Sequence, residues 1–407
     1  MIQHASIFSQ LLTIFSRAEF ATLVRMYRSD YGAKGFSSWT QFICMLFCHL
    51  AQAKSLREIC NGLLCCLGKL RHLGILHAPN KSTLSYANEH RTCELYQELF
   101  YKTLEKVRVH GPAPRKNKRF RFKNRLLSID ATVIDLCLSL FPWADFRRTK
   151  GAIKLHMLLD HDGYLPTYAL ITEGNIADVH FARFLDLPKD SIVAMDRGYN
   201  DYELFSKWID RGIWFVTRLK SNAVYEVIEG RASIPALNIL SDEIIRFTGP
   251  ESSKKCPHPL RRVVVWDKEN QREIVLLTNH LTFGATTIAD IYKDRWQIEL
   301  FFKAIKQNLK IKTFVGTSKN ALKIQIWTAL IAILLIKYLQ FRASFNWSLS
   351  NLVALLRLNL FTYRNIWDWL NKPFDTLPEG IDGIQLKLNF PAFGQQNSKI
   401  NKGVKKS

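Results

Sequence analysis

Residues 292–306 read Tyr-Lys-Asp-Arg-Trp-Gln-Ile-Glu-Leu-Phe-Phe-Lys-Ala-Ile-Lys, and their spacing is typical of a single two-faced helix. At about 100° per residue, four side chains share a stripe roughly 60° wide. They are Tyr292, Arg295, Glu299 and Lys306. The other side is apolar and suits burial, with Ile291, Ile298, Phe301, Phe302 and Ile305. Asp294 lies off the stripe, so the helix presents one carboxylate among cations, as a metal-dependent site acting on polyanions requires.

The charge of the whole chain points to the same kind of partner. The 407 residues carry 57 Lys and Arg against 35 Asp and Glu, a formal net charge of +22. Such an excess favours a polyanionic partner, because neutralising phosphates drives non-specific binding to nucleic acid. The alternative is a basic protein without a nucleic-acid partner. Hydrophobic residues make up 47% of the chain, enough for a sizeable core.

The pattern of apolar residues and helix-breaking residues divides the chain into parts. Residues 1–110 are expected to form an N-terminal α-helical domain, followed by a basic linker at 111–125. Residues 126–345 show alternating β and α patterns and are expected to form a mixed-sheet core with a mostly β insertion at about 221–280. Residues 346–407 are expected to form C-terminal helices and a basic tail.

The N-terminal domain has two interpretations at this stage. Short capped helices among basic residues are typical of a helix-turn-helix-like DNA reader, but a helical dimerisation module has the same pattern. One long helix is expected from about Leu84 to Val109. The linker alternates Phe120 and Phe122 with cations, which favours an arm along a phosphate backbone over a solvated connection.

Three acids lie at the edges of predicted elements, and together they indicate a site. Asp130 lies within the first predicted strand, Asp196 ends a later apolar strand, and Glu299 lies on the helix of residues 292–306. If the two strands are neighbours, both aspartates converge and the helix brings the glutamate. Each acid also has a structural interpretation: Asp196 as a cap, for example, or Glu299 as the partner of Lys303.

Three carboxylates around one point repel each other and need cations to stay charged. Mg²⁺ suits such oxygen ligands, and two ions can activate the attacking oxygen and stabilise the leaving one. The eight cysteines include no paired C-x-x-C set, so a zinc site is not expected. Asp135 and Asp160 are also associated with strands and are weaker candidates.

These motifs resemble those of a known family. Asp130-Ala-Thr, Asp196-Arg-Gly-Tyr199 and the Y-x2-R-x3-E-x6-K spacing from Tyr292 are similar to the DDE transposases of bacterial insertion sequences, family four. The resemblance implies an α/β fold with an RNase H-like core, a β insertion between the second and third acids, and an N-terminal helical domain of uncertain role. It implies that Asp130, Asp196 and Glu299 are catalytic and bind two Mg²⁺ ions, with Mn²⁺ able to substitute.

The resemblance also implies the reaction and the DNA contacts. Cut-and-paste transposition would proceed by nicking at the terminal inverted repeats, hairpin formation, hairpin opening and strand transfer into target DNA. Trp296 is the candidate for stacking on a flipped base, with a packed aromatic as the alternative. The other expected DNA contacts are Tyr292, Arg295 and Lys306, and, from their position after Asp196, Arg197 and Tyr199.

Two other functions remain open at this stage. One is a catalytically inactive or repurposed DNA-binding protein, and the other is a Mg²⁺-dependent nuclease without strand transfer. The resemblance implies a homodimer assembled on DNA. The apolar segment from Ile326 to Ile336 is expected to be a buried helix too short to cross a bilayer, and no signal peptide is evident. We therefore expect a protein without a membrane partner in the bacterial cytoplasm, associated with the nucleoid when bound to DNA.

Overall fold

The computed structural model describes residues 5–66, 70–109, 120–147, 150–311 and 313–375. The basic tail and most of the linker predicted above lie outside these residues. The helices of the N-terminal part are α1 (Ile7–Leu12), α2 (Arg17–Met26), α3 (Ser38–Leu50), α4 (Leu56–Leu64), α5 (Lys81–His90) and α6 (Glu94–Val109). Serine side chains cap several of them. For example, Ser55 accepts a hydrogen bond from the Glu58 backbone N–H at the start of α4.

The long helix expected from Leu84 to Val109 is wrong, because the chain breaks between α5 and α6. Arg91 has extended backbone angles there. Its guanidinium group donates hydrogen bonds to the carbonyl oxygen of Phe36 and the side chain of Gln41, and it pairs with Asp30. These tertiary contacts outweigh the helical propensity of the segment.

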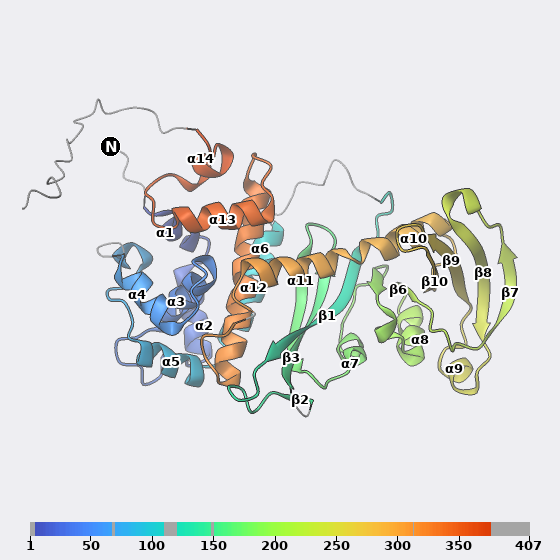
Figure 1. Ribbon diagram of the computed structural model, residues 1–407, viewed down its shortest axis with the longest axis horizontal. Coiled ribbons are helices and arrows are strands. Elements are labelled where there is room, and N and C mark those ends of the chain that lie inside the picture. Colours follow the sequence, from blue (N-terminus) through green and yellow to red (C-terminus); the bar gives the residue numbers. More distant parts are fainter. Residues whose placement is uncertain (1–4, 67–69, 110–119, 148–149, 312, 376–407) are drawn as a thin grey trace, which may run out of the picture.

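A mixed sheet forms the centre of the molecule (Figure 1). Its first six strands are β1 (Leu126–Leu136), β2 (Asp145–Arg147), β3 (Lys150–Asp160), β4 (Leu165–Glu173), β5 (Ile192–Met195) and β6 (Trp214–Arg218). Strand β3 lies between β1 and β4 and is antiparallel to both, while β1, β5 and β6 are mutually parallel neighbours. This arrangement confirms the predicted RNase H-like core.

The β insertion continues the same sheet. Its strands are β7 (Tyr225–Arg231), β8 (Ile239–Phe247), β9 (Leu260–Asp267) and β10 (Arg272–Thr278). Strand β10 pairs with β6, and β9, β8 and β7 follow in antiparallel order. The insertion therefore extends the central sheet outward from β6 (Figure 1).

Helices cover both faces of the sheet. One face carries α7 (Asp178–Arg183) and α8 (Tyr202–Asp210), whose apolar side chains share a cluster with β1, β5 and β6, and α9 (Pro250–Lys255), which contacts α8 and β8. The other face carries α10 (Ala285–Asp294) and α11 (Gln297–Asn308), which follow each other across the sheet (Figure 1). Strand β5 is buried throughout, as expected for a parallel strand covered on both sides.

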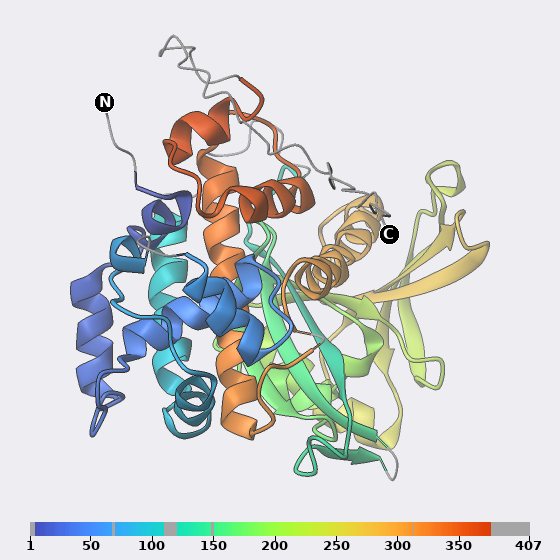
Figure 2. The same cartoon turned by 60° about the vertical axis from the view of Figure 1, so that its left-hand side comes forward.

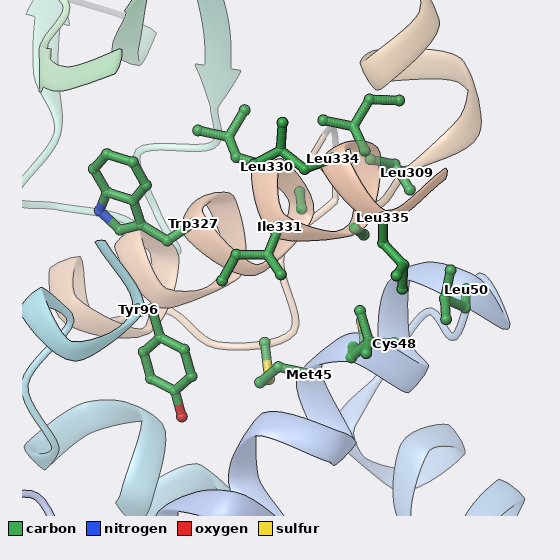
Figure 3. Close-up of a cluster of buried hydrophobic side chains, with 14 of the residues drawn as sticks. Met45, Cys48, Leu50, Tyr96, Leu309, Trp327, Leu330, Ile331, Leu334 and Leu335 are labelled. Carbon is green, nitrogen blue, oxygen red and sulfur yellow. The ribbon is translucent and has the colours of Figure 1, made fainter. Parts of the chain in front are cut away.

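Helix α12 (Lys319–Arg342) is the core of the helical half, with α13 (Leu349–Asn359) and α14 (Ile366–Asn371) packed at one end. It lies beside α3 and α6 in both views (Figures 1 and 2). Figure 3 shows its side chains among those of the N-terminal helices, with Ile331 near Met45 and Trp327 near Tyr96. One apolar cluster thus includes residues of α1, α3, β3, α11 and α12.

The apolar segment within α12 belongs to a longer helix than the sequence predicted. It runs for 24 residues, enough in length and composition to cross a membrane, but 83% of its most apolar window is buried inside the protein. A helix that is hydrophobic all round is expected in the centre of a core. The prediction that this segment is a buried helix is confirmed.

We expect buried histidines to make the fold sensitive to acid. Burial lowers the pKa of His49 to about 3 and those of His156 and His280 to about 4. The unfolded chain binds protons near pH 6.5 and the folded chain does not, so stability falls as the pH drops from about 6.5 towards 4. At pH 5 each histidine contributes a loss of about 2 kcal/mol.

Urea unfolding midpoints between pH 7.5 and 5 measure this loss. His49→Gln should remove one of the three histidine contributions to this loss, whereas His90→Gln, at an exposed position, should leave the loss unchanged. An identical pH slope in His49→Gln and the parent protein would contradict the assignment.

Candidate active site

Three charged side chains stand in a row on adjacent strands. Met195 pairs with Ile129 of β1, and Ala194 of β5 pairs with Val216 of β6. Continuing these registers places Asp130 opposite Asp196, and Asp196 opposite Arg218. Ala194 and Val216 pack in the apolar cluster that includes α10, so the strand period of two directs the charged side chains to the same face.

Helices α10 and α11 close the site from above this face. The Tyr292 hydroxyl lies 3.4 Å from Asp196 Oδ1, and Arg295 Nη2 donates to Glu299 Oε1 at 2.8 Å. Arg295 Nη1 also lies 3.8 Å from Asp130 Oδ2. The structure therefore brings the three predicted acids to one place, with Arg295 as their common neighbour.

The prediction of one uninterrupted helix over residues 292–306 is wrong in detail. Helix α10 ends at Asp294 and α11 begins at Gln297. Arg295 and Trp296 keep right-handed helical angles, but the Trp296 and Ile298 N–H groups bond to carbonyls three residues back. Such tightening bends the helix axis. The apolar positions predicted on this stretch are all buried.

Asp130 is the most desolvated of the three acids. Burial raises its pKa to about 6, and the charges of Glu299 and Asp196 act in the same direction. The Ala131 N–H, which donates to Asp130 Oδ1 at 2.8 Å, and the Arg295 guanidinium group oppose the rise. The ionised carboxylate is thus incompletely neutralised by the protein, which favours an additional cation beside it.

Asp196 is stabilised in its charged form. Burial acts to raise its pKa, but hydrogen bonds from Arg218 and the Arg197 backbone, together with the charges of Arg218 and Arg295, lower it overall. Arg218 Nη2 lies 2.8 Å from Asp196 Oδ1. Arg218 was missed by the sequence reasoning. Its signal was its place at the end of a buried parallel strand, where side chains of neighbouring strands meet.

Arg295 was expected to contact DNA phosphates rather than the acids of the site, and its ion pairs correct that expectation for the protein without DNA. Its guanidinium group pairs with two of the three acids, and Glu299 pairs with Arg295 rather than Lys303. In the described ranges, no three His, Cys, Asp or Glu side chains are placed to hold one metal ion. The donor set is nevertheless all carboxylate oxygen, which fits a hard divalent cation once Arg295 releases Glu299.

The remaining candidates for DNA contact differ in accessibility. Trp296 is 55% exposed beside the site, and Arg197 is also exposed. Lys306 Nζ donates to the Val133 carbonyl oxygen of β1 at 2.9 Å. Tyr199 is 1% exposed and belongs to the apolar cluster of α7 and α8, so the expected phosphate contact of Tyr199 is wrong for this conformation.

The weaker acidic candidates lie elsewhere. Asp135 is exposed further along β1, on the opposite face of the strand from Asp130. Asp160 forms a two-pronged pair with Arg125 at 2.8 and 2.7 Å. His156 is buried and bonded to Thr172, in keeping with a structural histidine.

Family comparisons cover most of the chain. The family described as "Transposase DDE domain" matches residues 121–335, a range that includes all three acids. A second family, described as a domain of unknown function (DUF4372), matches residues 3–76.

Similar proteins carry corresponding names. "Putative transposase y4zB" of Sinorhizobium fredii is 32% identical over 264 residues, covering 64% of this chain and 71% of its own. "Probable transposase for insertion sequence element IS5377" of Geobacillus stearothermophilus is 31% identical, covering 57% and 62%. A cryo-EM structure of the piggyBac transposase synaptic complex with hairpin DNA covers 87% of this chain and 78% of that one, with a TM-score of 0.41 and 10% identity.

Proposed function

The chain belongs to the transposase DDE-domain family, and from this we propose that it cleaves DNA at the terminal inverted repeats of an insertion sequence and joins the freed ends to target DNA. The observation that carries the proposal is the register that aligns Asp130 with Asp196, beneath the helix pair that carries Glu299. Carboxylates from three distant segments share one basic neighbour, Arg295.

Asp130, Asp196 and Glu299 would hold two Mg²⁺ ions, with Mn²⁺ able to substitute. The raised pKa of Asp130 supports this assignment, because a buried carboxylate short of positive charge is stabilised by a hard cation. When bound, the ions supply Lewis-acid activation of the attacking oxygen and stabilisation of the leaving one. Glu299 becomes free to bind a metal ion when its partner, Arg295, pairs with another anion instead.

That other anion is a DNA phosphate. Arg295 and Arg218 each pair with an acid of the site, and in each guanidinium group the Nε atom is buried without a hydrogen-bond partner. A phosphate near the acids would offer both guanidinium groups a further charged acceptor. Tyr292 on α10, Lys306 on α11 and Arg197, directly after Asp196, would add contacts along the DNA backbone.

The proposed chemistry is a series of phosphoryl transfers. Water attacks a phosphodiester at the element's end and releases a 3′-OH, which attacks the opposite strand and forms a hairpin. A second water opens the hairpin, and the 3′-OH then attacks a target phosphodiester. In each step one P–O bond forms and one breaks, so positioning and charge neutralisation by the site residues carry the catalysis.

Incubation with Mg²⁺ and DNA that bears the inverted repeats flanking the gene tests this proposal. Hairpin-ended products and strand transfer are expected. Cuts without hairpins or joining would favour a nuclease instead, and a gel shift without cleavage would favour a DNA-binding protein. Cross-linking with and without this DNA tests the proposed homodimer, which should form on DNA.

Trp296 is proposed to stack on a base turned out of the helix when the hairpin forms. Trp296→Ala should lower hairpin yield about tenfold or more and leave the first nick within about threefold, because stacking contributes roughly 1–3 kcal/mol per base. Trp296→Phe should retain most of the hairpin. Denaturing gels of end-labelled DNA measure both products.

The matched control for Trp296 is Leu300→Ala, one turn further along α11 and also exposed. It should leave both steps unchanged. Equal loss of hairpin in the Trp296 and Leu300 variants would contradict a stacking role specific to Trp296.

We place the protein in the cytoplasm, on the nucleoid when bound to DNA. The net charge of +22 and the burial of α12 inside the protein support this location. Fluorescence microscopy of a tagged full chain in a bacterium should show overlap with the nucleoid.

A further inference from the structure

Three buried polar side chains connect the sheet to the helix pair. Asp294, the last residue of α10, lies with Oδ2 2.7 Å from His161 Nδ1. His161, in the turn between β3 and β4, lies with Nε2 2.6 Å from Ser128 Oγ on β1. The three residues are only 4%, 6% and 0% exposed, respectively.

Ser128, His161 and Asp294 are hydrogen-bonded in the same order as the catalytic triad of a serine hydrolase. Their burial excludes a catalytic role of that kind. Ser128 is fully buried, and a nucleophile must reach its substrate. An ionised carboxylate only accepts hydrogen bonds, so the His161 proton shared with Asp294 lies on Nδ1. Nε2 then accepts from the Ser128 hydroxyl, and the chain of bonds runs in one direction from strand to helix.

The histidine is itself fixed to the sheet. Its backbone N–H donates to the Leu126 carbonyl oxygen at 3.0 Å. The preceding residue, Asp160, pairs with Arg125 at the start of β1. His161 is therefore held by β1 through both backbone and side chain, and it offers a fixed donor to the helix above.

The two ends of this connection lie next to the site residues. Ser128 precedes Asp130 by two positions, so both side chains leave β1 on the same face. Asp294 directly precedes Arg295, where α10 bends into α11. The apolar contacts of α10 attract without direction, so they do not by themselves fix how far the helix slides or turns. The hydrogen bond between Asp294 and His161 is directional, so it fixes the position of the helix at the bend.

We propose that Ser128, His161 and Asp294 form a clamp that sets the position of Arg295 and Glu299 relative to Asp130. The three are positioning residues, because their buried side chains act on Arg295 and Glu299 through the end of α10. The inference rests on the proposed function, because the position of Glu299 matters through DNA cleavage.

Single-turnover cleavage of terminal-repeat DNA with Mg²⁺, measured beside the Kd for that DNA, tests the clamp. Asp294→Ala should cleave about 100-fold more slowly at a Kd within about twofold, since misplacement by about 1 Å costs that much. Asp294→Asn keeps an oxygen acceptor for Nδ1 and should recover to within about tenfold. Ser128→Ala leaves no charge unpaired and should also lose about tenfold.

The matched control is Asp242, a second buried aspartate whose ion pair, with Arg261, lies in the β insertion. Asp242→Asn neutralises a buried, hydrogen-bonded carboxylate as Asp294→Asn does, but it should leave the cleavage rate unchanged. Rates within threefold of the parent protein in Asp294→Ala and Ser128→Ala would overturn the clamp, as would a loss in Asp242→Asn equal to that in Asp294→Asn.

Amide hydrogen exchange over residues 294–300 gives a readout that needs no catalysis. Exchange there should accelerate about tenfold in Ser128→Ala and Asp294→Asn and stay unchanged in Asp242→Asn. Unchanged exchange in the first two variants would overturn the clamp. If the parent protein never cleaves DNA but exchange accelerates in these two variants, the proposed function is overturned and the clamp stands.

Discussion

Glu299→Gln is expected to lower the rate of DNA cleavage by on the order of 10³-fold or more and to leave DNA binding within about threefold. The substitution removes a charged oxygen ligand and keeps an amide oxygen that still accepts from Arg295. The helix should therefore keep its place while the site loses a carboxylate. Single-turnover nicking of labelled terminal DNA and gel-shift titration measure the two effects.

The matched control for Glu299 is Glu243 on β8. It too is a partly buried glutamate paired with an arginine, Arg262, at 2.8 Å. Glu243→Gln should cleave at the parent rate. Full cleavage by Glu299→Gln would remove Glu299 from the proposed ligand set.

Asp130→Asn is expected to abolish cleavage and to make the protein more stable. Its pKa is about 6 in the folded protein against an ordinary 3.8, so the folded state binds the proton more tightly than the unfolded state. The contribution of this one carboxyl to parent stability, opposite in sign to that of the buried histidines, therefore falls as the pH rises from about 4 to 6, and its full penalty persists above pH 6. The neutral amide escapes it, a gain of about 1–3 kcal/mol at pH 8 that disappears near pH 4.

Asp196→Asn, in the same site, should change the stability of the protein in the opposite direction. Arg218 holds that carboxyl in its charged form and lowers its pKa, so neutralising it should destabilise the protein at pH 8. Urea unfolding midpoints at pH 5 and 8 measure both variants. A shift of the same sign in both at pH 8 would contradict the assigned environments.

The three acids could be found from sequence because each stands at a recognisable place. Asp196 directly follows a short apolar strand, and Glu299 shares a polar stripe with cations. Their convergence needed the strand order, which depends on contacts between residues far apart in the chain. The family resemblance supplied that order, and the structure confirms it.

The features not predicted from the sequence depend on local backbone geometry or on tertiary contacts. The bend at Arg295 and Trp296 leaves both residues helical, so the apolar period does not reveal it. Tyr199 looked available because it follows Asp196, but the short 3-10 turn after β5 directs it into the core. Arg218 was not predicted from the sequence, because its partner Asp196 is 22 residues away in the chain and lies beside it only in the folded sheet.

The burial of α12 between the N-terminal helices and the sheet bears on how such a gene can change. The segments that match two separate families, residues 3–76 and 121–335, have side chains that pack in one apolar cluster. Exchanging either segment for a foreign counterpart would strip α12 of complementary neighbours. Recombination between diverged copies should therefore give a folded protein when both segments come from one parent.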